Sequence, residues 1–367
     1  MKKRTYVKYS DIEKLQQEYN PNYIIMFGGR NDGKSYAAKE KVIRDFFERG
    51  AMFTYLRRYA IDIKDVDNRD YWTDFINDNG KGNKISELSG GLYNDIDCEK
   101  NKIYLAMTAD EKTTRGPQIG YIHALSAEGR LKSLQFPAVD TIIYEEFCTS
   151  GMYLYDEVTH FMNYCSTIAR DRRITVLLVG NTISRQNAFF REWELNNIGK
   201  QQPGTVDIYR FTQGEKEIVI ATYYTCTIKE NTMFFGSAAK MITGGEWESQ
   251  EQPHLEGPES DYEEIYRLTF ETDKLNRFLM RFLVSHKTDT GIWYITKRTS
   301  EIKPDERIIS PVLRESLLYT SDFYPLSHNE QLIFQYIKMG RIAYGDNLTG
   351  TEFKRAIKQL SVINSSV

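Results

Sequence analysis

A glycine-rich octapeptide limits what this chain can fold into more than any other feature. Residues 28–35 spell GGRNDGKS and follow a short apolar run, Tyr23 to Phe27, which predicts a buried strand. Residues 36–49 have apolar side chains at roughly helical spacing and end at Gly50, which predicts a helix with a C-terminal glycine. A strand, a loop of the form G-x-x-x-x-G-K-[ST] and a helix together are the context of a phosphate-binding P-loop.

The residue types in this loop suit a nucleoside triphosphate. Glycines let backbone N–H groups approach phosphate oxygens, and the N-terminus of the next helix attracts the same anion. Lys34 is predicted to reach the β- and γ-phosphates, and Ser35 to ligate Mg²⁺. The alternative is a glycine turn with an incidental lysine. Predicted nucleotide contacts come from the whole loop: Gly28, Gly29, Arg30, Asn31, Asp32, Gly33, Lys34, Ser35 and Tyr36.

Other apolar segments predict the sheet around this loop. Uniformly apolar strands are expected at 52–56, 141–144 and 174–179, with a helix over 155–168. Residues 1–20 are expected to be helical and polar. Two more strands, 102–107 and 121–125, are expected around a polar turn, and the Asp- and Asn-rich residues 61–85 are interpreted as a surface excursion. The alternation predicts an α/β fold with a mostly parallel sheet.

A P-loop enzyme also needs acidic residues near the γ-phosphate. The strand ending in Ile142-Ile143-Tyr144 delivers Glu145 and Glu146 at its C-terminal edge. We predict that Glu145 is the metal-side acid and that Glu146 activates the attacking water. Aspartate is more usual at the first position, so the longer Glu145 is a departure. The alternative is a strand end with two solvated acids.

Polar residues after the last predicted strand, and arginines before it, suggest further roles. Asn181 is a candidate sensor of the γ-phosphate or the catalytic water, or else a turn residue. Arg170, and after it Arg172, are candidates for an arginine finger acting on a neighbouring subunit's nucleotide, or else they suit a helix C-terminus.

The sequence does not decide the roles of three other groups of basic residues. Arg30 is predicted either to contact the γ-phosphate or to face a neighbour. Arg57 and Arg58 either reach the nucleotide, couple the site to a partner, or form a solvated strand end. Arg130 and Lys132 are possible DNA contacts or a solvated basic loop.

Composition excludes several other classes of protein. The net charge is −3 and the four cysteines form no CxxC pair, so neither a global nucleic-acid-binding surface nor a zinc ribbon is indicated. Widely spaced cysteines favour a reducing, cytosolic setting. The sequence has no apolar run near the ~18 residues of a membrane helix. An apolar segment typical of a signal peptide does not follow the basic N-terminus.

Composition changes near residue 243 and predicts a second domain. Residues 244–264 contain eight acidic residues and no Lys or Arg, which is typical of a linker or mobile surface segment. The expected organisation is an ATPase domain at 1–228, an acidic linker or lid at 229–265, and a smaller α+β domain at 266–367. In the last, 281–286 and 292–298 predict a hairpin around KTDTG, and helices are expected at 329–338 and 350–360.

Taken together, these motifs resemble the DNA-packaging ATPases of small podovirus phages, which are compact relatives of terminase large subunits. The resemblance lies in GGRNDGKSY, FTYLRRY, DTIIYEEF and RDRR in this order, and it covers roughly residues 20 to 190. It implies a motor that uses ATP and Mg²⁺ to pump double-stranded viral DNA into a prohead. Its partners would be DNA, the prohead portal, a possible structural RNA and copies of itself, with a homopentamer expected. It would work in the host cytoplasm, attached transiently to the portal vertex.

The resemblance also assigns roles to residues and to the second domain. Lys34 and Ser35 would bind phosphate and metal, Glu145 and Glu146 would be the two acids, and Arg170 the finger in trans. In larger terminases the second domain is an RNase H-like nuclease with clustered acids. Here the strand 281–286 has no acid and Asp289 falls in the hairpin turn, so a vestigial domain without nuclease activity is expected.

Other functions stay open from sequence alone. A different DNA-translocating P-loop ATPase is the main alternative, although we find no further helicase motifs. A small-molecule kinase would need a lid and an acceptor pocket in one subunit, and its hydrolysis would not respond to DNA. A non-enzymatic binding module would have no need of two carboxylates opposite a P-loop.

Overall fold

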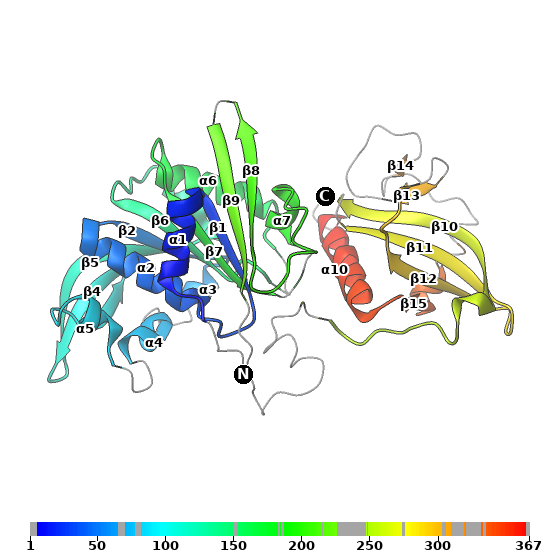
Figure 1. Ribbon diagram of the computed structural model, residues 1–367, viewed down its shortest axis with the longest axis horizontal. Helices are drawn as coiled ribbons and strands as arrows, with labels where there is room; N and C mark the ends of the chain where they lie inside the picture. The colour runs from blue at the N-terminus through cyan, green and yellow to red at the C-terminus, as the bar shows by residue number, and fades with distance from the viewer. Residues whose placement is uncertain are drawn as a thin grey trace. The chain divides into compact units, whose positions relative to one another are not determined.

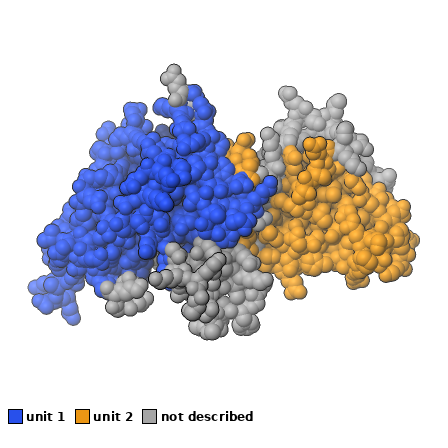
Figure 2. All heavy atoms as spheres, in the orientation of Figure 1, with its two compact units in different colours: residues 1–183, 197–246 blue, residues 184–196, 247–367 orange. Residues whose placement is uncertain are grey.

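The chain forms two compact units, which we describe separately (Figures 1 and 2). Unit 1 comprises residues 1–183 and 197–246, and unit 2 comprises residues 184–196 and 247–367. The structure is a computed structural model, and it describes residues 6–64, 70–77, 82–149, 153–182, 184, 187–214, 216–225, 247, 249–273, 276–302, 306–309, 319–320, 332 and 335–364.

Unit 1 is built on a nine-stranded sheet in the order β3-β4-β5-β2-β6-β7-β1-β9-β8. The central pairs β5–β2, β2–β6, β6–β7, β7–β1 and β1–β9 are parallel, while the pairs at both edges are antiparallel. The predicted mostly parallel α/β sheet is therefore confirmed. The strands are β1 (Tyr23–Gly28), β2 (Met52–Arg57), β3 (Asp95–Glu99), β4 (Lys102–Ala109), β5 (Lys112–Ala124), β6 (Val139–Glu145), β7 (Thr175–Asn181), β8 (Val206–Gln213) and β9 (Lys216–Thr225).

Helices cover both faces of this sheet, which explains why its central strands are apolar throughout. Helix α2 (Lys34–Arg49) places Ala37, Ala38, Val42 and Ile43 in a core with Ile24 and Met26 of β1 and Ile143 of β6. Helix α6 (Glu157–Ala169) covers the opposite face, where Phe161 stacks on Tyr144 with ring centroids 5.4 Å apart. Helix α1 (Tyr9–Tyr19) packs beside α2. Residues 6–8 are not helical, so the predicted N-terminal helix begins later than expected.

Residues 61–85, which we interpreted as a surface excursion, contribute to the core instead. The described part contains α3 (Ile61–Lys64), η1 (Asp70–Trp72) and α4 (Thr73–Ile76), followed by α5 (Lys84–Leu88). Trp72 and Phe75 are fully buried, and Trp72 meets Phe53 of β2 edge-on at 5.8 Å. The prediction was wrong because the Asp and Asn residues of this segment outnumber the few aromatic side chains that anchor it.

Two other parts of unit 1 differ from the sequence prediction. The polar turn expected between 107 and 121 is a long hairpin, in which β4 and β5 meet at a tight turn around Asp110 and Glu111. Strands β3, β8 and β9 were not predicted. β9 lies beside β1 in parallel register, with Gly28 opposite Thr225, and so extends the sheet past the P-loop strand.

Unit 2 contains a six-stranded sheet in the order β14-β13-β10-β11-β12-β15. Strands β10, β11 and β12 form an antiparallel meander that includes the predicted hairpin, and β13 lies parallel to β10. The sheet thus has antiparallel strands at its centre and parallel pairs toward both edges. Its elements are α7 (Ala188–Glu192), η3 (Glu259–Asp261), β10 (Tyr262–Asp273), β11 (Asn276–Ser285), β12 (Gly291–Lys297), β13 (Arg307–Ile309), β14 (Tyr319–Thr320), β15 (Ile342–Tyr344) and α10 (Asn347–Asn364).

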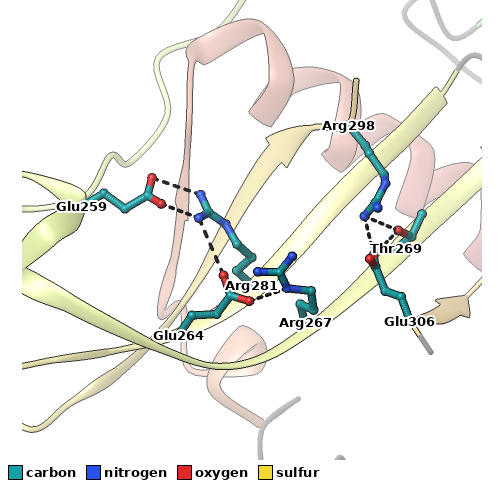
Figure 3. Close-up of polar contacts among 7 residues, drawn as sticks. All are labelled: Glu259, Glu264, Arg267, Thr269, Arg281, Arg298 and Glu306. Atoms are coloured by element: carbon teal, nitrogen blue, oxygen red, sulfur yellow. Dashed lines mark hydrogen bonds and ion pairs between the residues drawn. The ribbon is translucent and has the colours of Figure 1, made fainter. Parts of the chain in front are cut away.

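One face of this sheet is apolar and the other carries charge. Phe270, Phe278 and Trp293 pack with Phe353 of α10 in the core of unit 2. On the opposite face Arg267 lies opposite Arg281, and the two guanidinium groups are held by Glu259 and Glu264 (Figure 3).

Both ends of unit 2 were only partly predicted. Residues 249–254, which we interpreted as part of an acidic linker, pack in unit 2: Gln252 is buried, and Tyr344 N donates to Pro253 O at 2.8 Å. Residues 226–246, which include most of the predicted linker before residue 247, lie outside the described residues. The predicted domain boundaries at 228 and 265 therefore stay predictions. Of the expected helix 329–338, the described residues 332 and 335–338 are helical.

Across the described residues, none of the helices combines the length and the apolar character needed to cross a membrane.

Candidate nucleotide-binding site

The P-loop lies between β1 and α2, as predicted, and its glycines are required by their surroundings. Gly28 has φ +155°, and a Cβ there would lie 2.1 Å from Thr225 Oγ1 and 2.5 Å from Thr225 O. Gly33 has φ +86°, and a Cβ there would lie 2.9 Å from Val7 O. Any larger residue would therefore displace β9 or the N-terminal segment from the loop.

Lys34 and Asn181, predicted to act at the same phosphate, lie together. The buried Lys34 Nζ donates to Gly29 O at 2.6 Å and to Asn181 Oδ1 at 3.4 Å. The end of β7 is tied to the loop, because Thr182 N donates to Gly28 O at 3.0 Å. The cation thus lies between the loop and the neighbouring strand, at the carboxyl edge of the parallel sheet.

Glu145 lies at the same edge, close to Ser35. Strand β6 places Glu145 opposite Val179 of β7, two residues before Asn181. Burial raises the pKa of the Glu145 carboxyl, and hydrogen bonds from Ser35 and Tyr71 together with the charge of Lys39 oppose that rise. The two predicted metal ligands, Ser35 and Glu145, are therefore adjacent.

Glu146 lies one residue further on, where the chain leaves the strand. Its backbone is left-handed, with φ +57°, so its side chain does not continue the alternating up-and-down pattern of the side chains in β6. The carboxylate is 60% exposed and pairs with Arg57 Nη2 at 2.8 Å. An exposed pair of this kind is worth about 0–1 kcal/mol, so Glu146 can turn away from Arg57 at little cost.

Arg58, which the sequence left as a possible nucleotide contact or solvated end, is a buried brace. Its Nη1 and Nη2 donate to Glu146 O at 3.1 Å and to Phe147 O at 2.9 Å. The same guanidinium pairs with buried Glu157 at 2.7 and 3.0 Å, and Tyr144 Oη donates to that carboxylate at 2.7 Å. This network fixes the unusual backbone turn that carries Glu146.

The two candidate finger arginines lie at the other edge of the sheet. Arg170 and Arg172 precede β7, whereas the P-loop follows β1, and seven parallel residues at ~3.3 Å each put about 20 Å between these edges. Arg172 donates to three backbone carbonyls, those of Phe136, Val139 and Ile168, at 2.8 Å each. Exposed Arg170 donates to Leu134 O at 3.1 Å. Neither reaches the P-loop of its own chain.

The remaining predicted residues occupy varied places. Arg30 and Asn31 are exposed at the tip of the loop. Buried Asp32 accepts from Thr225 Oγ1 at 2.9 Å, and Tyr36 packs on Phe75 with centroids 4.6 Å apart. Lys132 pairs with Glu128 at 3.8 Å, and Arg130 is exposed nearby. Their roles toward nucleotide or DNA stay predictions.

Two residues at the site were missed by sequence reasoning. Tyr71 Oη donates to Glu145 Oε1 at 3.0 Å, and Thr225 braces both Gly28 and Asp32. The pair Tyr71-Trp72 inside an otherwise polar segment was an available signal for the first. Thr225 gave no local signal, because its role follows from the unpredicted pairing of β9 with β1.

Comparison with known proteins identifies the family. A family model described as podovirus DNA encapsidation protein (Gp16) matches residues 1–209. The chain belongs to this family. The DNA packaging protein of Bacillus phage B103 is 29% identical over 174 residues, 46% of each chain. That of Bacillus phage phi29 is 27% identical over 186 residues, 50% of this chain and 48% of the relative. The chain thus matches about half the length of these curated Gp16-family relatives.

Solved structures support the same fold along the whole chain. A chain of the bacteriophage phi29 viral genome packaging motor assembly is similar with a TM-score of 0.55 and 18% identity, covering 97% of this chain and 99% of the other. The phi28 gp11 DNA packaging motor gives a TM-score of 0.50 at 15% identity, with the same coverage. At these identities the likeness establishes the fold of this Gp16-family member, a P-loop domain followed by a second domain built on the six-stranded sheet.

Proposed function

We propose that this chain is an ATP-hydrolysing motor that moves double-stranded viral DNA into a prohead. The observation that carries the proposal is the meeting of Lys34, Ser35 and Glu145 at one edge of the sheet, with Glu146 on the next residue. Membership of the Gp16 family and the names of its relatives supply the substrate, since those relatives are DNA packaging proteins.

The residues present suit Mg²⁺, which prefers oxygen ligands. The Ser35 hydroxyl is among the groups that lower the pKa of the Glu145 carboxyl, so these two oxygen-bearing groups lie close together. Bound there with ATP, the ion would neutralise charge on the β- and γ-phosphates. Lys34 would bind those phosphates, Asn181 would contact the γ-phosphate or the attacking water, and Glu146 would accept the proton of that water.

The position of Arg170 supports an oligomeric ring. Because Arg170 lies about 20 Å from its own P-loop edge, a finger role for it would be on the nucleotide of a neighbouring copy. Arg170 is a better finger than Arg172, because its guanidinium donates to one backbone carbonyl whereas that of Arg172 donates to three. A homopentamer on the portal vertex in the host cytoplasm, with DNA and a possible structural RNA as partners, agrees with this arrangement.

We propose further that unit 2 binds its partners without cutting DNA. Two-metal nucleases need acidic side chains available to hold metal ions. In the described part of unit 2, three buried acids face cations instead: Glu271 pairs with Arg277 at 2.6 Å, Glu352 with Lys297 at 3.2 Å, and Glu306 with Arg298 (Figure 3). Each of these carboxylates is therefore already paired with a protein cation.

The test is ATP hydrolysis measured with and without double-stranded DNA over a range of protein concentrations. A ring with fingers in trans predicts specific activity that rises with assembly and with DNA. Arg170→Ala is expected to abolish hydrolysis although ATP still binds, and mixing it with the Lys34→Ala variant should restore part of the activity, since a finger from one copy completes the pocket of another.

Arg210→Ala is the matched control, because it removes an exposed arginine that pairs with Glu217 on the adjacent strand, at 3.0 Å, away from the P-loop. Activity that is independent of concentration and of DNA, and intact in Arg170→Ala, contradicts the motor and favours a small-molecule kinase.

A further inference from the structure

Glu145 presents a geometric problem that a shorter aspartate would not. Its side chain has one more rotatable bond, so its carboxylate has more positions to lose when it is fixed beside a metal ion. In this chain the carboxylate does not rely on Ser35 alone. Tyr71 Oη donates to Glu145 Oε1 at 3.0 Å, from a segment outside the P-loop and outside β6.

Tyr71 is itself fixed from several directions. The ammonium of Lys39 lies 4.1 Å from the centre of the Tyr71 ring and also bonds the Tyr71 carbonyl. Lys39 is buried and pairs with Asp74 at 2.7 Å. On another side the Tyr71 ring packs on Tyr55 of β2, with centroids 4.2 Å apart. The tyrosine is therefore held by the P-loop helix and by a strand of the sheet at once.

The neighbours of Tyr71 along the chain keep this arrangement in place. Trp72 and Phe75 are buried in the core of unit 1, which anchors η1 and α4 against β2 and α2. A hydroxyl carried on such an anchored segment is preorganised, because it needs no reordering when a ligand binds.

We propose that Tyr71 is a positioning residue for the metal-side acid: its hydroxyl holds the Glu145 carboxylate beside Ser35 in the orientation that receives the nucleotide-bound Mg²⁺. This inference rests on the proposed function. Tyr71 compensates for the extra methylene of Glu145. Removing partners that orient metal ligands typically weakens metal binding by about 10- to 100-fold.

The experiment measures Mn²⁺ binding to the full-length protein saturated with ADP, by electron paramagnetic resonance of the free ion. Tyr71→Phe keeps the ring and its contacts with Lys39 and Tyr55 and deletes only the hydroxyl. We expect its Mn²⁺ dissociation constant to rise about 10-fold, with ADP affinity in the absence of metal unchanged. Tyr164→Phe is the matched control, because it deletes a buried hydroxyl that bonds His123 at 2.8 Å rather than Glu145; its Mn²⁺ affinity should equal that of the unaltered protein.

A double-variant cycle separates positioning from general loss of structure. In a Glu145→Asp background the shorter carboxylate no longer meets the Tyr71 hydroxyl, so adding Tyr71→Phe should change Mn²⁺ affinity by less than about twofold. An equal loss in both backgrounds, or no loss in either, overturns the proposal. If the unaltered protein binds neither ADP nor Mn²⁺ with ADP, the nucleotide site itself is wrong; if it binds both and Tyr71→Phe binds as well, only the positioning role is wrong.

Discussion

The buried brace behind Glu146 allows a test that separates stability from catalysis. The change is Arg58→Met, which keeps an apolar stem of similar length and removes the guanidinium. Arg58 makes two bonds to buried Glu157 and one each to the carbonyls of Glu146 and Phe147. Its loss leaves Glu157 as a buried charge without its cation, which costs about 3–5 kcal/mol of unfolding free energy.

The expected size of the effect can be stated for heating experiments. In a unit of some 200 residues, 1 kcal/mol shifts the melting temperature by about 2–4 °C. Arg58→Met should therefore lower the melting temperature by about 10 °C in differential scanning calorimetry. Arg44→Met is the control, because its partner Glu40, at 2.7 Å on α2, keeps a second cation in Lys84 at 3.4 Å, so the loss should cost about 1 kcal/mol or less.

A second substitution then separates the two roles of Arg58. Glu157→Gln removes the stranded charge, and its one amide oxygen can still accept from either Tyr144 or Leu154 N, which bond different oxygens of the carboxylate. Arg58→Met with Glu157→Gln should regain at least half of the lost stability. The rate of ATP hydrolysis should stay about 10- to 100-fold below that of the unaltered protein, because the backbone carbonyls beside Glu146 still lack the guanidinium donor of Arg58. A double variant that hydrolyses ATP at the normal rate would refute the claim that Arg58 positions Glu146.

Three further results follow from the structure. Burial lowers the pKa of His123 to about 4, so between pH 4 and 6.5 the unfolded chain binds more protons than the folded one. The free energy of unfolding should therefore fall by about 2 kcal/mol from pH 7 to pH 5 in urea titrations. His123→Gln should make this pH dependence shallower. Gly28→Ala should weaken ATP binding in calorimetry at least tenfold, since its Cβ would collide with Thr225; unchanged affinity contradicts the P-loop geometry. Trp72→Ala should cost about 3–5 kcal/mol in the same urea titrations, whereas a surface excursion would lose almost nothing.

Much of the P-loop domain could be predicted because its signals are local. The apolar run of β1, the loop glycines and the amphipathic α2 follow one another directly, so strand, loop and helix were recognised with their boundaries nearly correct. Lys34 and Asn181 could be paired in advance because parallel strands end at one edge of the sheet. Such inferences need only the chain direction and the order of elements.

The parts that failed depend on contacts between distant segments. Tyr71 lies at the site because Trp72 anchors its segment against β2. A local sequence pattern cannot predict this contact between distant segments. β9 has a recognisable apolar stretch, but the sequence does not say which strand it pairs with. The role of Thr225 depends on the pairing of β9 with β1, so it could not be predicted either. Arg58 lies next to Arg57 in sequence, yet Arg58 is buried and Arg57 is partly exposed, because β2 ends at Arg57 and the chain beyond it turns Arg58 toward buried Glu157.

The central claim is that the P-loop and the two acids after β6 form a single pocket for Mg²⁺ and ATP. Its most direct test is a paired measurement of ATP binding and ATP turnover in Lys34→Ala and Glu146→Gln. The account predicts that Lys34→Ala loses both, whereas Glu146→Gln retains bound ATP and does not turn it over. Normal turnover in Glu146→Gln, or tight ATP binding in Lys34→Ala, would contradict it.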